Sequence, residues 1–203
     1  MIEVHHLAAS RSRRITWALE ELGQTYEVIN YARDPVTNLA PPELKAIHPL
    51  GKAPILRDGA VTLIESGAII DYLIRTYGKG RLQPAVTSPD YSHYVQMLHY
   101  AEGSAMLPLL LRLYVSRLGD AGKPLHPRIA SEMDTHLGWL NGELAGRDYF
   151  VGNDLTGADI NLSFVAQMAI RFAGRDAYPS LTAFVDRIEA RPAYQRAIER
   201  SGA

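Results

Sequence analysis

Residues 2–31 read IEVHHLAASRSRRITWALEELGQTYEVINY, and this stretch decides the fold. Its first six residues form a short apolar, β-branched run, which is typical of a buried strand. Apolar side chains then recur at helical spacing from Ile15 to Leu22, and Gly23 closes that segment. Residues 26–31 form a second strand-like run. We therefore predict a β-α-β unit whose two strands are parallel and whose crossover is right-handed.

The next fifty residues extend this unit. Residues 35–42 read as a loop and 43–47 as a single helical turn. The pair Asp58-Gly59 separates two short apolar runs, which is a strong hairpin signal. Another amphipathic helix begins at Ser66 and ends near Gly78. The resulting order, β-α-β-α-β-β-α, is that of a thioredoxin-like α/β domain, which we place at residues 1–80.

The rest of the chain is predicted to be an all-α domain of residues 90–203, joined through a proline-containing linker at 81–89. Helical patterns cover 91–118, 127–144, 158–173 and 181–188, and we expect Pro108 to kink the first of them. Thr156 as helix cap with Asp159 three residues later is a variant capping box, which predicts the start of a buried helix.

Composition excludes several classes of function. The chain has 203 residues, of which 47% are hydrophobic, and 21 basic against 22 acidic residues give a net charge of −1. A nucleic-acid-binding protein is not expected, because phosphate binding requires a basic excess. No cysteine is present, so the protein has no disulfide and no thiol of its own with which to attack a substrate. The seven histidines lack metal-ligand spacing, so we expect no metal. No signal peptide or membrane segment is recognisable, and we expect a soluble cytoplasmic protein.

The first candidate site element is Ser10, where the opening strand turns into helix. A serine there is an ordinary helix cap. Three arginines, Arg11, Arg13 and Arg14, follow at a helix start, where the helix dipole favours acidic residues instead. This reversal suits a bound anion beside the hydroxyl. The alternative is that the arginines reach acidic residues elsewhere, for instance Arg14 towards a helix of the second domain.

Two further elements follow along the chain. In Gly51-Lys52-Ala53-Pro54 a proline comes directly before a strand, which predicts an edge or turn with a cis peptide, and the backbone of Ala53 is placed to pair with an extended peptide. Glu65 and Ser66 open the next helix, where Ser66 and backbone N–H groups suit a carboxylate and Glu65 an ammonium group. The other interpretation of these two residues is an ordinary helix start capped by Ser66.

Over essentially its whole length the sequence resembles the cytosolic glutathione transferase superfamily. The resemblance rests on Ser10, on Gly51-Lys52-Ala53-Pro54, on Glu65-Ser66 eleven residues after the proline, and on the motif at residues 156–159. Residues 10–23 look most like the serine-type branch of bacteria and yeast. The resemblance implies that Ser10 hydrogen-bonds the glutathione sulfur, with Ser12 as a competitor. It also implies glutathione contacts for Lys52, Ala53, Pro54, Glu65 and Ser66, and for Glu102 across a homodimer.

The implied function is transfer of glutathione, as co-substrate, to apolar electrophiles, as in detoxification. Met106, Leu109 and Leu110 are candidates for the electrophile pocket, and ordinary core packing is the other interpretation of these three. Reduction of hydroperoxides or disulfides by the bound thiolate is an alternative activity. A non-catalytic ligand-binding protein and an interaction module on the same fold are the remaining alternatives.

Overall fold

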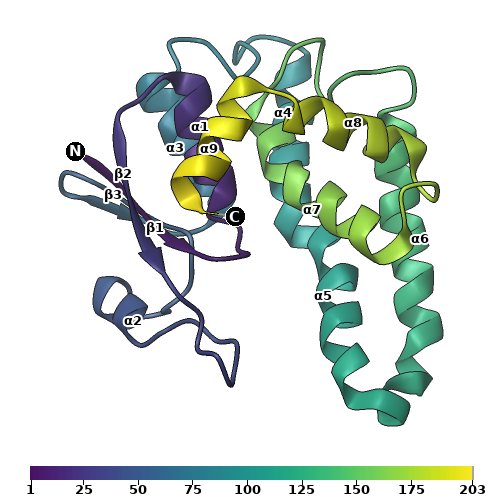
Figure 1. Ribbon diagram of the computed structural model, residues 1–203. Helices are drawn as coiled ribbons and strands as arrows, with labels where there is room; N and C mark the ends of the chain where they lie inside the picture. The colour runs from purple at the N-terminus through teal and green to yellow at the C-terminus, as the bar shows by residue number, and fades with distance from the viewer. Residues whose placement is uncertain (203) are drawn as a thin grey trace. The chain divides into compact units, whose positions relative to one another are not determined.

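A computed structural model describes residues 1–202 and contains one four-stranded sheet in this range (Figure 1). The strands are β1 (Ile2–Leu7), β2 (Tyr26–Tyr31), β3 (Ile55–Asp58) and β4 (Val61–Leu63), in the order β2-β1-β3-β4. β1 pairs with β2 in parallel, and β3 runs antiparallel to both β1 and β4. The β-α-β unit and the hairpin predicted from the sequence are confirmed.

Three helices accompany the sheet in the first part of the chain: α1 (Arg13–Leu22), α2 (Glu43–Ile47) and α3 (Ser66–Tyr77). The apolar positions that predicted α1 are the ones it buries, and Ile15, Ala18 and Leu19 are fully buried. Gly23 ends α1 in the left-handed conformation, with φ of 67°, where a Cβ would be strained. The core of this part therefore follows from the same periodicity that predicted the elements.

The chain divides into two compact units, residues 1–83 together with 189–203, and residues 84–188. The sequence pattern did not reveal the last helix, α9 (Pro192–Ser201), and assigned its residues to the helical domain. In the structure α9 contacts α1. The ring of Tyr194 packs edge-on against Trp17, with 5.2 Å between centroids. The predicted boundaries at 80 and 90 themselves stay a prediction.

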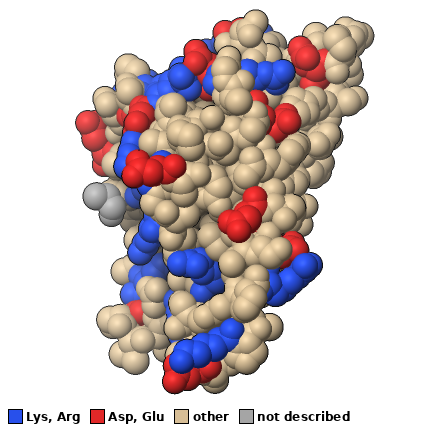
Figure 2. Space-filling model, turned by 90° about the vertical axis from the view of Figure 1, so that its right-hand side faces the viewer, with Lys and Arg blue, Asp and Glu red and all other residues tan. Residues whose placement is uncertain are grey.

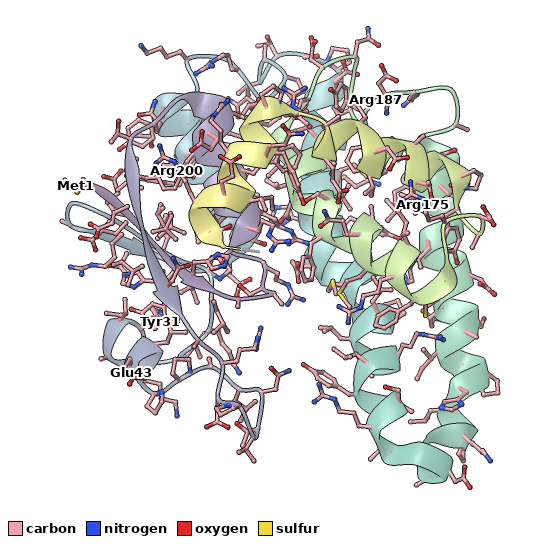
Figure 3. The ribbon with its side chains drawn as sticks, viewed as in Figure 1. Met1, Tyr31, Glu43, Arg175, Arg187 and Arg200 are labelled. Carbon is pink, nitrogen blue, oxygen red and sulfur yellow. The ribbon has the colours of Figure 1, made fainter. Side chains whose placement is uncertain are left out.

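Acidic residues at the end of α1 hold α9 in place. Glu21, whose side chain is only 10% exposed, accepts two N–H groups of Arg191 at 2.6 and 2.9 Å and the indole N–H of Trp17 at 2.9 Å. Glu20 forms ion pairs with Arg196 and Arg200, at 2.7 and 3.1 Å. Arg200, labelled in Figure 3, also lies 4.9 Å from the centre of the Tyr26 ring. Ion pairs between residues about 170 positions apart in the sequence therefore hold α9 against α1.

Arg191→Ala is expected to lower the free energy of unfolding by about 2 kcal/mol, because it leaves the nearly buried Glu21 carboxylate with its guanidinium partner removed. Urea unfolding followed by tryptophan fluorescence measures the change. Arg75→Ala is the matched control: its pair with Asp71 is 61% and 34% exposed, and pairs of that kind contribute about 0.5 kcal/mol or less. Equal losses in the two variants would contradict the role given to Glu21.

Residues 84–188 are helical. The elements are α4 (Asp90–Tyr100), a π-helical turn η1 (Ala101–Ala105), α5 (Met106–Val115), a 3-10 segment η2 (Ser116–Leu125), α6 (His126–Glu143), α7 (Gly157–Ala173) and α8 (Pro179–Glu189). The pattern predicted one helix over 91–118 with a kink at Pro108. The structure interrupts it one turn earlier, at η1, because Pro108 has no N–H for a carbonyl in the preceding turn.

The predicted capping box at the start of α7 is confirmed. Thr156 is the N-cap residue, and its backbone N–H and hydroxyl both donate to Asp159 Oδ2, at 2.8 and 2.6 Å. The other oxygen, Oδ1, accepts the Phe150 N–H at 2.8 Å. Asp159 is fully buried, and burial raises the pKa of its carboxyl to about 6 although the hydrogen bonds act in the opposite direction. One side chain thus joins a helix start to the preceding loop.

Acidic and basic side chains both occur on the face shown in Figure 2, separated by broad areas that carry neither kind. This distribution agrees with the near-zero net charge of the sequence. Among residues 1–202, no helix combines the length and the apolar character required to cross a membrane.

Candidate functional site

Strand register places the three candidate site elements, which are the Ser10 turn, the Ala53-Pro54 loop and the Glu65-Ser66 helix start, at one end of the sheet. β1 ends at Leu7, just before Ser10, and His5 of β1 pairs with Ile55, the first residue of β3 after Pro54. Leu63, the last residue of β4, pairs with Leu56. The end of β1, the start of β3 and the end of β4 therefore lie together. In Figure 3, Tyr31 marks the same end of β2, on the side where α2 begins at Glu43.

The turn after β1 carries Ser10 at a half-buried position, between the exposed Ala8-Ala9 and the helix. Ala9 has a positive φ of 50°, which is uncommon for a residue with a side chain. Arg33 secures the turn, since its Nε and Nη2 donate to the carbonyls of Ala8 and Ala9 at 2.9 and 3.3 Å. The hydroxyl of Ser10 thus sits on a turn that is held from a second loop.

The prediction that Ser10 caps the first helix is wrong. α1 begins at Arg13, and Ser12 occupies the N-cap position without capping through its side chain. The physical reason is a tight turn before the helix, closed by the Arg14 N–H on the Arg11 carbonyl at 3.1 Å. Ser10 Oγ accepts the Ser12 N–H at 3.2 Å. Ser10 therefore orders the turn that leads into α1.

A chain of hydrogen bonds connects Ser10 to the protein interior. Ser10 Oγ lies 2.6 Å from Ser12 Oγ, and Ser12 Oγ lies 2.8 Å from His6 Nδ1. Ser12 and His6 are buried, at 0% and 2% exposure. From the sequence, His6 was not singled out, a solvated or structurally bonded role was expected for it as for the other histidines, and no local signal distinguishes it from the neighbouring His5. The contact depends on which face of β1 each histidine occupies.

The basic residues after Ser10 differ in environment. Arg11 and Arg13 are half-buried, whereas Arg14 is 2% exposed. Arg14 Nη1 donates to Ser66 Oγ at 3.0 Å, so the first turn of α1 is tied to the first residue of α3. Of the predicted elements, the structure thus brings the arginine cluster and the Glu65-Ser66 pair into direct contact.

The other predicted residues lie in two loops. The Ala53–Pro54 peptide bond is cis, as expected. Pro54 is buried, Ala53 half-buried and Lys52 exposed. Glu65 is exposed and occupies the N-cap position of α3 with φ of 68°. Such a conformation in a residue other than glycine costs on the order of 1–3 kcal/mol and is found mainly at functional sites. Ser66 follows as the first helical residue, so Glu65 and not Ser66 is the cap.

The remaining predicted residues lie in the second unit. Glu102 is half-buried within the π-helical turn η1, an element that is frequent at functional sites. Met106 and Leu109 are buried, at 1% and 0% exposure, and Leu110 is half-buried. Of these three, only Leu110 exposes an appreciable part of its side chain, so the structure places Met106 and Leu109 in the core.

The neutral state of His6 has a consequence for stability. Burial lowers the pKa of His6 to about 4, and the charge of Arg13 acts in the same direction. An unfolded histidine takes up its proton near pH 6.5. The folded state, in which His6 is buried and neutral, is therefore fully favoured above about pH 6.5, and this contribution to stability is lost as the pH falls towards 4.

Between pH 6.5 and 4 we expect the free energy of unfolding to fall more, or to rise less, in the wild type than in His6→Asn, because the variant lacks the titrating imidazole. Asp159, whose pKa is raised to about 6, contributes with the opposite sign but equally in both proteins. Burial also lowers the pKa of His5, so the variant retains part of the slope. Urea unfolding at pH 7, 5.5 and 4.5 measures both proteins. Parallel profiles would show that His6 is not the group responsible.

Comparison with known proteins gives a consistent result. Residues 4–83 match the family described as "Glutathione S-transferase, N-terminal domain", and residues 104–192 match "Glutathione S-transferase, C-terminal domain". Glutathione S-transferase 1 of Saccharomyces cerevisiae is 31% identical, with coverage of 100% of this chain and 96% of the relative.

Two solved structures are similar over nearly the whole chain. A glutathione S-transferase from Actinobacillus pleuropneumoniae is 38% identical with a TM-score of 0.90, covering 99% of this chain and 93% of that one. A glutathione transferase family member from Pseudomonas fluorescens Pf-5, solved with two glutathione molecules bound, is 26% identical with a TM-score of 0.83, covering 98% and 92%.

Proposed function

Because this chain belongs to the glutathione S-transferase family, we propose that it binds glutathione and transfers it to apolar electrophiles, with Ser10 as the hydrogen-bond donor to the glutathione thiolate. The observation that carries the proposal is the convergence of the Ser10 turn, the Pro54 loop and the Glu65-Ser66 helix start at one end of the sheet. Glutathione bound to the relative from P. fluorescens supports the ligand.

Exposure favours Ser10 over Ser12 as the sulfur contact. Ser12 is 0% exposed and its hydroxyl is shared between His6 and Ser10. Ser10 is half-buried and stands at the outer end of that chain. A ligand atom can therefore approach Ser10 without moving a core side chain, whereas contact with Ser12 requires rearrangement of the turn.

The remaining glutathione contacts follow from the chemistry of the converging loops. The backbone of Ala53 beside Pro54 would pair with the cysteinyl residue as an added strand. The N-terminus of α3, with Ser66, would hold the γ-glutamyl carboxylate, and exposed Glu65 its ammonium group. Exposed Lys52 would take the glycyl carboxylate. In this proposal residues 1–80 bind glutathione, and residues 90–203 supply the electrophile pocket, to which Leu110 contributes.

The reaction depends on ionising the bound thiol. A thiol of pKa about 8.5 is only about 3% thiolate at pH 7, and lowering the pKa by about 2 makes thiolate the major form. A hydroxyl donor, the positive N-terminus of α1 and the nearby side chains of Arg11 and Arg13 favour the anion. The thiolate then attacks the electrophilic carbon of, for example, an aryl halide, so that a C–S bond forms while the carbon–halogen bond breaks and halide leaves.

We further propose a homodimer that acts in detoxification in the cytoplasm, with Glu102 reaching the glutathione of the partner subunit. Support comes from the family and from the placement of Glu102 in a π-helical turn. Sedimentation at micromolar concentration is expected to give twice the chain mass. A monomeric mass at every concentration would remove the role given to Glu102.

Two measurements test the function itself. Calorimetry should detect glutathione binding, and steady-state kinetics should detect conjugation of an aryl halide that depends on glutathione concentration. Binding without turnover of aryl halides, hydroperoxides or disulfides would identify a ligand-binding protein. Absence of binding would leave an interaction module on the same fold. Both outcomes would overturn the proposal.

A further inference from the structure

The hydrogen-bond chain behind Ser10 is continuous from strand β1 to the turn before α1. It begins at His6 in β1, passes through Ser12 at 2.8 Å and reaches Ser10 at 2.6 Å. Its inner members are buried and its outer member is half-buried. The His6 Nε2 atom has no hydrogen-bond partner among residues 1–202. These facts restrict where the protons of the chain can lie.

Each serine hydroxyl carries one proton, so the chain runs in one direction only. In the first arrangement His6 Nδ1 is bare, Ser12 donates to it, and Ser10 donates to Ser12. The proton of Ser10 then points inward. In addition, the neutral ring carries its proton on Nε2, as a buried N–H without an acceptor, which is rare in folded proteins and carries the full desolvation cost of an unpaired donor.

In the second arrangement His6 Nδ1–H donates to Ser12 Oγ, and Ser12 donates to Ser10 Oγ. Ser10 Oγ also accepts the Ser12 N–H at 3.2 Å, so both of its lone pairs are occupied. The only group that Ser10 retains for another partner is its own O–H. The unpaired atom of the ring is now an acceptor, which is tolerated better than a buried unpaired donor. The Leu7 carbonyl, 3.5 Å from Ser12 Oγ, is too far away to compete strongly for the Ser12 proton.

We propose that His6 and Ser12 are positioning residues that direct the Ser10 hydroxyl proton outward, towards the sulfur of bound glutathione. This inference rests on the proposed function. Neither residue touches substrate; His6 acts through Ser12, and Ser12 through Ser10. Burial keeps the ring neutral, because it lowers the pKa of His6 to about 4. The ring therefore stays in a single protonation state at neutral pH, so that its tautomer sets the direction of the chain.

The readout is the pKa of the glutathione thiol in the binary complex, measured by titrating the ultraviolet absorbance of the thiolate. His6→Leu removes the donor, and we expect the pKa of the bound thiol to rise by about 1, as for loss of one oriented hydrogen bond to a charged group. Ser12→Ala should raise it similarly. His6→Asn places an amide N–H near the position of Nδ1–H and should restore the wild-type value. At pH 6.5 the KM for glutathione should change by no more than about twofold in all three, because only the hydrogen bond to the sulfur weakens and the other ligand contacts remain.

His5→Leu is the matched control. His5 neighbours His6 in β1 and is equally buried, at 1% exposure. Its Nδ1 lies 2.9 Å from the Tyr31 hydroxyl, which is not part of the His6–Ser12–Ser10 hydrogen-bond chain. We expect a loss of stability in this variant with the pKa of the bound thiol unchanged. A merely structural role for His6 would make the two leucine variants behave alike.

The outcomes separate this inference from the proposed function. The inference is overturned if the bound thiol keeps its wild-type pKa in folded His6→Leu. If that variant does not fold, the same result in folded Ser12→Ala overturns it. The proposed function still stands in either case, provided that Ser10→Ala raises the pKa of the bound thiol. If glutathione bound to the wild-type protein has the thiol pKa of free glutathione, the proposed function fails first, and the inference fails with it.

Discussion

Ser10→Ala is expected to raise the pKa of bound glutathione by about 1–2, because a hydrogen bond to a charged group contributes about 1.5–3 kcal/mol and each pKa unit corresponds to about 1.4 kcal/mol. The thiolate fraction at pH 6.5 then falls by about 5-fold to 50-fold. A more basic thiolate is also more nucleophilic, with a Brønsted slope of about 0.4–0.5. We therefore expect kcat for an aryl halide to fall by only about 2–6-fold at pH 6.5.

The pH profile gives this prediction its sharpest test. Above about pH 9 both proteins hold mostly thiolate, so the two rates should converge or cross. Ser10→Thr keeps the hydroxyl and should behave like wild type, whereas Ser116→Ala removes an exposed hydroxyl of the second unit, bonded to Leu113, and should have no effect. A profile of Ser10→Ala parallel to wild type at every pH would exclude Ser10 as the donor that sets the thiol pKa.

Asp159→Ala is expected to lower the free energy of unfolding by about 3–4 kcal/mol, which is a large part of the stability of an ordinary domain. The carboxylate accepts three hydrogen bonds, two from backbone N–H groups of Phe150 and Thr156. Alanine leaves these buried donors without an acceptor and removes the cap of α7. Urea unfolding followed by circular dichroism measures the loss.

Two further variants grade the effect. Thr156→Val removes only the hydroxyl bond and should cost about 1 kcal/mol, whereas Thr156→Ser keeps that bond and should cost less. Should Asp159→Ala not fold, these two still test the box. The raised pKa of Asp159, about 6, also means that the folded state binds the proton of this carboxyl more tightly than the unfolded state. The stabilisation that comes from protonating Asp159 is complete below about pH 4 and is lost as the pH rises through 6. A stability difference below 1 kcal/mol between wild type and Asp159→Ala would contradict the prediction.

The accuracy of the sequence predictions depended on the distance between the interacting residues. The capping box is an interaction of Thr156 with Asp159, three positions apart, and the hairpin depends on the two residues Asp58-Gly59. Both were predicted correctly, because short-range rules describe them completely. The cap of the first helix was misplaced by two residues, at Ser10 instead of Ser12, since a tight turn at residues 11–14 competes with the cap and local propensity does not decide between them.

The candidate site shows the same division. Ser10, Pro54 and Glu65-Ser66 were singled out from residue type and spacing, and the pairing of β1, β3 and β4 brings their segments to one end of the sheet. His6 was not singled out, because nothing near it in the sequence distinguishes it from His5. The Arg14–Ser66 contact spans 52 residues and the Arg191–Glu21 pair 170. No periodicity encodes such contacts.

By itself, the sequence determined the order of the strands and helices in the first 80 residues and the turns between them, and it indicated the residues that we propose bind glutathione. Alternation and helical spacing are properties of neighbouring residues, so they can be read along the chain. Only the tertiary structure decided which of the two serines is half-buried and which fully buried, which histidine lies behind them, and which helix α1 packs against. These features depend on strand register and on packing between distant segments, where shifting a strand by one residue exchanges His5 for His6.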